Sequence, residues 1–289
     1  WRDLRNPIPA QIIELNRVGA GLRSEYQGAL RLGSMAGEWT TGLDVSDQRD
    51  DRTEFSNAGV APGDDQARNG VMQLQEFQEV RSVAPFARVS VALRPQWRLT
   101  AGARYDHYRF RSTDHFLADG DQSSGRTMEA VSPMVGVTYL VTDRLNLYGN
   151  LATAYQTPLT VELTNPLLRE GGFNPDLDPA TLRSGEAGVR GLADRVKVRY
   201  EVSGYLSNVK NALVGFQRAD QKTYYRNAGE ARRNGVEMLL DWEPIPRLQA
   251  RLAYTYQHFT FTRFVAPEGD FSGRREPSTA ILSSTSRLT

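Results

Sequence analysis

The stretch RVKVRYEVSGYLSNV, residues 195–209, decides the fold of this chain. Its even positions from Val196 to Leu206 carry apolar or small side chains, whereas the odd positions from Lys197 to Ser207 are mostly polar. Because successive side chains of a strand point to opposite faces of its sheet, this alternation predicts a strand with one apolar and one polar face. The run exceeds the roughly 5–6 residues usual for soluble strands. It is long enough for a tilted membrane strand, which needs about 9–11 residues.

Short and long interruptions alternate on either side of this run. The short ones lie at 94–97, 142–145, 192–195 and 243–247, and the long ones at 112–127, 157–182 and 208–222. This rhythm is typical of an antiparallel up-and-down sheet with tight turns at one end and large loops at the other, as in outer-membrane barrels. We predict about ten strands, at 11–26, 34–50, 76–93, 97–113, 128–142, 145–156, 183–191, 195–209, 231–243 and 247–264.

The fold class is therefore predicted as all-β, an antiparallel up-and-down transmembrane β-barrel. The short turns would be periplasmic, and the loops at 51–75, 112–127, 157–182 and 210–230 would project into water, with 210–230 able to extend two strands above the membrane. Outward-facing aromatic residues would form the interfacial girdles; they are Trp39, Tyr105, Tyr139, Tyr155, Trp242, Tyr254 and Tyr256. Alternation alone also fits a soluble sandwich, in which the apolar face would meet a second sheet.

Composition excludes several other classes. A net charge of +1 argues against a nucleic-acid partner held by bulk charge. The chain has no cysteine, which removes thiolate chemistry and disulfides. Its three histidines show no ligand spacing, and it has neither a Gly-x-Ser-x-Gly elbow nor a phosphate-binding loop. We therefore expect no enzyme, no catalytic residues, no metal site and no cofactor.

A series of short motifs resembles TonB-dependent outer-membrane receptors of the siderophore type. The motifs are SPMVGVTY at 132–139, LNLYGN at 145–150, YQTPL at 155–159, NPDLDP at 174–179, SGEAGVRG at 184–191, YRNAG at 225–229 and NGVE at 234–237. No single motif is specific, but their order and spacing carry the resemblance.

That resemblance implies a barrel of about 22 strands filled by a globular plug. The family is energised by the TonB complex and imports ferric siderophores or similar chelates, sometimes haem, cobalamin or sugars, across the bacterial outer membrane. This chain corresponds to part of the barrel, residues 1–277, without the plug that contacts TonB. Residues 278–289 are rich in Ser and Thr and alternate poorly, so we hypothesise a truncated or frameshifted reading after about Pro277.

Ligand contacts are expected from loop and upper-lumen side chains. Many such chelates are anionic, and Arg and Tyr donors suit them. The candidate substrate-binding residues are Arg109, Gln156, Tyr205, Tyr224, Arg226 and Gln257. Glu186 and Glu237 should point into the lumen, where they can pair with Arg199 or Arg251. Expected partners are a ferric siderophore or similar chelate, the TonB complex and outer-membrane lipid. The alternatives are a passive porin-like channel and a surface-binding β-protein without transport.

Overall fold

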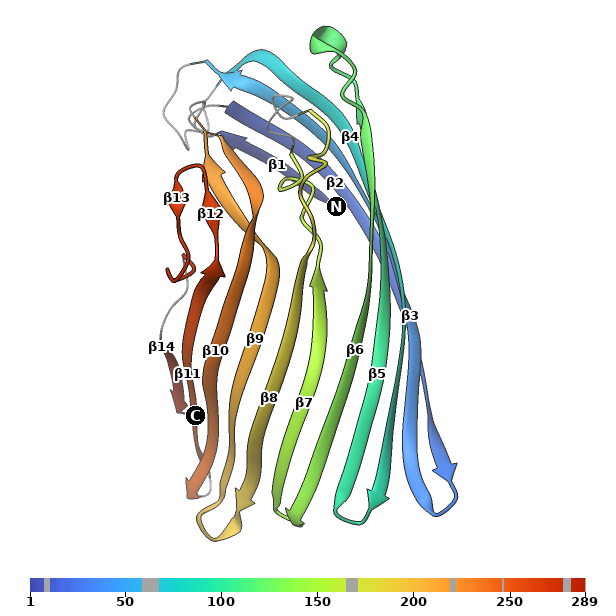
Figure 1. The fold of residues 1–289 in the computed structure, drawn as a ribbon, viewed down its shortest axis with the longest axis vertical. Coiled ribbons are helices and arrows are strands. Elements are labelled where there is room, and N and C mark those ends of the chain that lie inside the picture. Colours follow the sequence, from blue (N-terminus) through green and yellow to red (C-terminus); the bar gives the residue numbers. More distant parts are fainter. Residues whose placement is uncertain are drawn as a thin grey trace.

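The computed structural model describes residues 1–7, 11–58, 68–164, 171–218, 222–245, 247–277 and 282–288. Twelve strands form one antiparallel sheet in which sequence neighbours pair (Figure 1). They are β1 (Arg2–Pro7), β2 (Gln11–Leu32), β3 (Met35–Asn57), β4 (Asn69–Arg94), β5 (Trp97–Asp114), β6 (Ser124–Thr142), β7 (Leu145–Gln156), β8 (Ala180–Ala193), β9 (Val198–Gln217), β10 (Thr223–Ile245), β11 (Leu248–Arg263) and β14 (Leu282–Leu288). The sheet is curved, and its edges β1 and β14 do not pair with each other.

The remaining elements are short. A hairpin of β12 (Val265–Ala266) and β13 (Gly269–Asp270) follows β11, and two 3-10 turns lie at Leu117–Asp119 and Asp194–Val196. In the part of the chain that the structure describes, no helix is long and apolar enough to span a membrane. The strand β14 pairs along β11, from Leu282 opposite Tyr256 to Leu288 opposite Ala250.

The tight turns all lie at one end of the sheet, the lower end in Figure 1. The four turns predicted from the sequence are confirmed, because they link β4 to β5, β6 to β7, β8 to β9 and β10 to β11. A fifth tight turn joins β2 to β3 at Gly33, whose φ of 63° lies in the left-handed region that glycine tolerates.

The strands extend further toward the loop end than the sequence predicts. β3 continues to Asn57 and β4 begins at Asn69, so the predicted loop at 51–75 is wrong over most of its length. β6 likewise begins at Ser124, within the predicted loop at 112–127. The expectation that residues 210–230 lengthen two strands is confirmed by β9 and β10. These extensions stand above the apolar band, so they lack the alternation that marks a strand in lipid.

The two faces of the sheet differ as alternation requires. We call inner the face against which the β7–β8 connection packs; it carries Phe110 and Met128. We call outer the opposite face, on which large apolar side chains such as Val83, Leu206 and Val236 are exposed. The outer apolar run covers, for example, 198–206 on β9 and 83–93 on β4. At about 3.3 Å per residue and a tilt near 40°, these runs span roughly 20–25 Å, the height of the lipid-facing band of barrels.

The outer face changes from apolar to charged along a single level of the sheet. On β3 and β4, Val45 lies opposite Val83, and two residues further toward the loops Asp47 lies opposite Arg81. The same change occurs on β9 and β10. Leu206 and Val236 carry apolar side chains on this face, and beyond them Asn208 lies opposite Arg232. This level marks where hydrocarbon gives way to the polar headgroups.

Aromatic residues line the turn end of the outer face. The rings of Trp97 and Tyr139 lie 4.7 Å apart, and Trp242 donates a hydrogen bond from Nε1 to the carbonyl of Val196 at 3.0 Å. Tyr155 departs from the predicted girdle, because it packs against the inner cluster around Phe110. The β6–β7 ladder ends at Met134 and Ala152, so at Tyr155 the strand is paired with β8 only.

Candidate functional site

Cross-strand ion pairs occupy the inner face of β2–β5. Arg17 donates to both carboxylate oxygens of Asp50, at 2.7 and 2.6 Å. The register sets these two residues directly opposite each other. Arg104 donates to Asp106 at 2.8 Å and also contacts Asp44. Charge-assisted, bidentate contacts of this kind hold side chains in one geometry, so this part of the wall is rigid and polar.

Nearer the loops, the inner face buries charge and receives segments from distant strands. Glu54 and Glu76 are buried, at 0% and 2% exposure, and Arg52 is paired with Glu54. Lys222, in the β9–β10 connection, places Nζ 3.9 Å from Glu54. The amide of Gly172, in the β7–β8 connection, donates to Glu76 at 2.8 Å. Two connections from the middle of the sheet thus reach across the inner face to β3 and β4.

The β7–β8 connection is fixed to β5 and β6 by an apolar cluster. Leu163, Phe173 and Leu177 pack with Phe110 and Met128, and all five are buried. Arg126 on β6 secures the same connection, because its Nη1 donates to the carbonyls of Asn174 and Leu177, both at 2.6 Å. The connection therefore folds onto the inner face of the sheet.

A second cluster joins the top of β8–β10 to the segment after β11. It contains Ala180, Val209, Ala231, Phe261 and Phe264, with Ala212 and Ala228. The predicted candidate Arg226 lies at its margin. It donates to Glu268 at 2.7 Å, and its guanidinium lies 4.6 Å from the ring centroid of Phe216. This hydrogen bond lowers the pKa of Glu268 below its usual range.

Four other candidates lie on or above the inner face. Tyr224 is 2% exposed and packs against Phe216, 6.2 Å between ring centroids, so its side chain faces protein. Tyr205 is half-buried on the inner face of β9 and Gln257 on that of β11. Gln156, the last residue of β7, is exposed opposite Ala180. Tyr224 is therefore enclosed by the fold, whereas Gln156 is exposed and Tyr205 keeps part of its surface accessible.

Arg109 lies elsewhere. Its neighbours Tyr108 and Phe110 face the inner cluster, so alternation places Arg109 on the outer face, opposite Arg81 and Thr127. It is exposed there. The prediction that Arg109 reaches a ligand in the lumen is not favoured by this orientation. The sequence carried a signal for this orientation. Arg109 lies four residues after Tyr105, so the alternation along β5 puts both side chains on the outer face.

The predicted pairing of Glu186 and Glu237 with Arg199 or Arg251 is also not what the structure shows. Glu186 accepts from Asn150 at 3.1 Å and from the hydroxyl of Tyr148 at 3.3 Å. Arg251 donates instead to Asp241, at 2.5 Å from Nε. The register explains the choice, since Asp241 lies directly opposite Arg251 on β11 and opposite Arg199 on β9.

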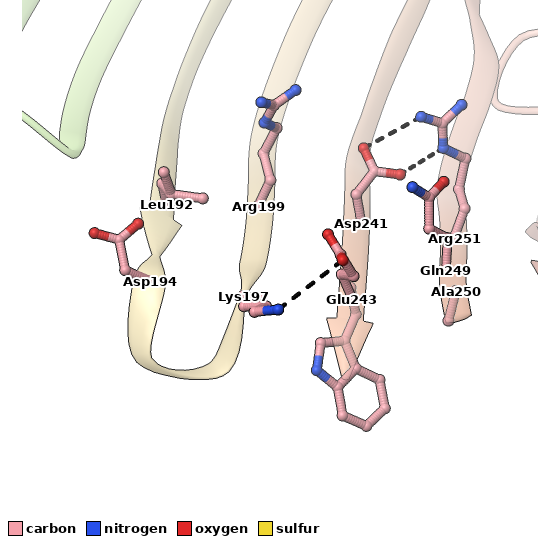
Figure 2. Close-up of a pocket in the computed structure, with 10 residues that line it drawn as sticks. Leu192, Asp194, Lys197, Arg199, Asp241, Glu243, Gln249, Ala250 and Arg251 are labelled. Atoms are coloured by element: carbon pink, nitrogen blue, oxygen red, sulfur yellow. Dashed lines mark hydrogen bonds and ion pairs between the residues drawn. The ribbon is translucent and has the colours of Figure 1, made fainter. Parts of the chain in front are cut away.

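These last residues line a charged hollow at the turn end of β8–β11 (Figure 2). Its volume is about 620 Å³. Figure 2 shows Asp241 directed at Arg251, with Arg199 on the neighbouring strand, and Lys197 reaching toward Glu243. The Lys197–Glu243 separation is 3.9 Å. Among the described residues, no three His, Asp or Glu side chains are grouped to hold a metal ion.

Several site residues escaped sequence reasoning. Arg126, Lys222 and Glu76 act through long-range contacts with loop segments, and nothing in their local sequence marks them. The apolar residues Leu163, Phe173 and Leu177 carried a signal, because apolar side chains recur inside an otherwise polar loop. Such residues in a loop indicate that it packs against the fold.

Comparison with known proteins extends over nearly the whole chain. Residues 6–288 match the family described as TonB dependent receptor-like, beta-barrel. Over 188 residues, 63% of this chain, the sequence is 26% identical to the metal-pseudopaline receptor CntO of Pseudomonas aeruginosa. The match covers 25% of that receptor.

Solved structures resemble the sheet. The ferric citrate transporter FecA superposes with a TM-score of 0.72 at 16% identity, over 96% of this chain and 40% of FecA. The ferric-catecholate import receptor Fiu from E. coli K12 gives a TM-score of 0.69 at 17% identity, over 95% of this chain and 42% of Fiu. At these identities the likeness concerns the fold. The chain spans about a quarter of the curated relative and less than half of each solved receptor.

Proposed function

Because this chain belongs to the TonB-dependent receptor-like β-barrel family, we propose that it forms part of the wall of an active importer of metal chelates. The family consists of transport receptors of the bacterial outer membrane rather than enzymes, and this chain is accordingly an outer-membrane barrel segment. The finer proposal is that the cargo is a ferric siderophore or a similar small chelate, taken up with energy from the TonB complex.

The observation that carries the proposal is the loop arrangement on the inner face. The β7–β8 connection and the segment after β11 fold onto that face through two apolar clusters. Folded loops narrow the entrance and bring side chains from separate strands close together. Such an arrangement suits a receptor that captures a scarce ligand, because it surrounds the ligand with side chains from several strands.

The proposed contacts follow the exposure of the candidates. Tyr205 and Gln257 stand on the inner face, and Gln156 is exposed at the loop end of β7; these three side chains offer amide and hydroxyl donors to a passing ligand. Arg226 and Tyr224 are engaged in the loop cluster. We propose that these two hold the loop in position, Arg226 through its ion pair with Glu268.

The names of the related receptors refer to more than one metal. The name of one relative refers to metal-pseudopaline, and those of the solved structures to ferric chelates and to copper. Recognition by these receptors would depend on the organic chelator as well as on the ion. We favour a ferric chelate because most of these resembling receptors carry names that refer to iron uptake.

The test is uptake by cells that carry the complete gene. Cells deprived of iron should accumulate radioactive iron from a chelate that this receptor accepts, and deletion of the gene or of TonB should each abolish the accumulation. Parallel assays with nickel, zinc and copper chelates identify the metal class.

The alternatives give different results in the same assay. Accumulation that survives the loss of TonB would point to a passive channel. Ligand capture at the cell surface without accumulation would point to a binding protein without transport. Either result would overturn the importer proposal.

A further inference from the structure

An apolar groove crosses the outer face of β7–β10. Gly204 leaves its floor open, and Leu151, Leu206 and Val236 line it, with the Leu151 side chain lying over Gly185. Its volume is about 510 Å³. The groove lies just below the level at which the outer face becomes polar, so it faces the hydrocarbon of the leaflet on the loop side of the membrane.

Three cations stand directly above this groove. Arg183 lies opposite Asn208, which lies opposite Arg232, so the two arginines occupy one level of the sheet, two strands apart. At about 4.8 Å per strand their backbones are roughly 10 Å apart. Lys210 follows on the same face of β9, one step closer to the loops. All three side chains are exposed.

None of the three has an ion-pair partner in the described ranges. The nearest carboxylate in the register is Glu230, opposite Lys210, yet no ion pair joins them within 4 Å. The outer face of β3–β5 differs, because there Arg81 is neutralised by Asp47 and Glu79, at 2.9 and 3.0 Å. In the described ranges, the set above the groove thus joins cations that have no ion-pair partner to an apolar channel beneath them.

We propose that this surface binds one phosphorylated lipid of the outer leaflet. An acyl chain would lie in the groove over Gly204, beside Leu151 and Leu206, and a phosphate would accept hydrogen bonds from Arg183 and Arg232. The guanidinium group suits phosphate because its planar donors match two oxygens at once. The loop end of the barrel faces outward, so the lipid belongs to the outer leaflet. The proposal requires only that the sheet lies in the outer membrane, and it does not depend on which cargo the receptor imports.

The first experiment removes the cations. The complete receptor is purified in detergent, stripped of lipid and titrated with diphosphoryl lipid A, and with the same lipid after its phosphates have been removed enzymatically. The variant with Arg183→Gln and Arg232→Gln should bind diphosphoryl lipid A about tenfold more weakly, because it loses the charge-assisted hydrogen bonds that the two guanidinium groups donate to phosphate. A double variant of two exposed turn-end arginines, Arg31→Gln and Arg94→Gln, is the matched control and should bind normally.

The second experiment fills the groove and leaves the charges intact. A side chain added at Gly204 meets its nearest atom, a carbonyl oxygen, at 3.8 Å, so Gly204→Leu fits the fold while it occupies the space for the acyl chain. It should weaken binding to a similar extent. Gly149→Leu, where the nearest atom is 3.6 Å away and which lies outside the groove lining, is the control.

Two comparisons decide whether the site exists: phosphorylated against dephosphorylated lipid, and test variants against control variants. Preference for the phosphorylated lipid that is lost in both test variants and kept in both controls would support the site. Equal binding of the dephosphorylated lipid, or unchanged binding by the arginine variant when its barrel still shows the heat-dependent gel shift of a folded protein, would overturn it.

Discussion

At the scale of single residues, aromatic rings lie across glycines of neighbouring strands. A side chain at Gly235 would meet the hydroxyl of Tyr205 at 2.6 Å and the carbonyl of Tyr256 at 2.5 Å. Gly188 stands in the same relation to Tyr148. Glycine in a strand has no side chain to pack, and the neighbouring ring covers that exposed backbone. The sequence already placed these glycines inside strands, but only the register identifies the ring that covers each one.

This arrangement predicts the effect of Gly235→Ala. The added methyl would displace both the Tyr205 ring and the β11 backbone, and overpacking of this kind costs about 1–3 kcal/mol. Urea unfolding of the complete receptor in micelles should show that loss. Gly204→Ala, one strand away on the outer face, has room and should leave the midpoint unchanged. Equal stability of the two variants would contradict the close packing at Gly235.

The Arg226–Glu268 contact predicts a pH dependence. The hydrogen bond from Arg226 lowers the pKa of Glu268, so the contact stabilises the segment fully above the unfolded pKa of about 4.3. That contribution is lost as the pH falls through the lower, folded pKa. Hydrogen exchange of residues 264–271, corrected for intrinsic rates, should be steady from neutral pH to about pH 5 and rise at pH values below about 4. Glu268→Gln should raise it already at neutral pH and leave only the pH dependence that Asp270 contributes, whose pKa is lowered by its hydrogen bonds with Ser272.

At the scale of elements, the strands were predictable where they cross lipid and not where they leave it. Residues 196–206 alternate because one face meets hydrocarbon and the other meets the lumen. Residues 51–57 of β3 are polar on both faces apart from Phe55, although the backbone pairing with β4 continues. Pairing needs only amides and carbonyls, so it survives where the alternation disappears. The sequence therefore marks the membrane-spanning part of a strand and underestimates its length.

The β7–β8 connection behaves as a packed element, which predicts the effect of Phe173→Ala. Phe173 is 5% exposed and its ring meets Phe110 edge-on at 6.3 Å. Truncation should cost about 3–5 kcal/mol of local packing, enough to release the connection from the sheet. Limited proteolysis of the folded receptor should then cut within residues 157–179 many times faster. Leu159→Ala is the control, since Leu159 is 64% exposed. Unchanged proteolysis of Phe173→Ala would show that the cluster does not hold the loop.

At the scale of the whole molecule, the sheet has two unpaired edges. β1 and β14 each pair on one side only within the described ranges. Unpaired amides in hydrocarbon cost several kcal/mol each. Residues 1–289 expressed alone should therefore associate through these edges in detergent and elute as assemblies from a size-exclusion column, whereas the complete receptor should elute as one defined species. A stable monomer of the isolated segment would contradict this prediction.

The candidate site was less predictable than the fold, for reasons of register. Alternation is enough to place Tyr205 and Gln257 on the inner face. It fails for Arg226, because the ladder between β10 and β11 shifts at Glu230 and Ala231, and Asn211 adopts a left-handed φ of 55°. Beyond such a shift, counting alternate residues from the membrane-spanning part of the strand no longer tells which side chains face inward. The ion pairs Arg17–Asp50 and Arg251–Asp241 depend on which residues lie opposite, and a single sequence does not specify that.

The way Arg126 holds the β7–β8 connection has an evolutionary consequence. Its two hydrogen bonds end on main-chain carbonyls, of Asn174 and Leu177, which every amino acid supplies. Side chains of the connection that do not enter the apolar cluster are thus free to drift under mutation while the anchor persists. Selection could alter the side chains that the connection displays without redesigning the wall that supports it.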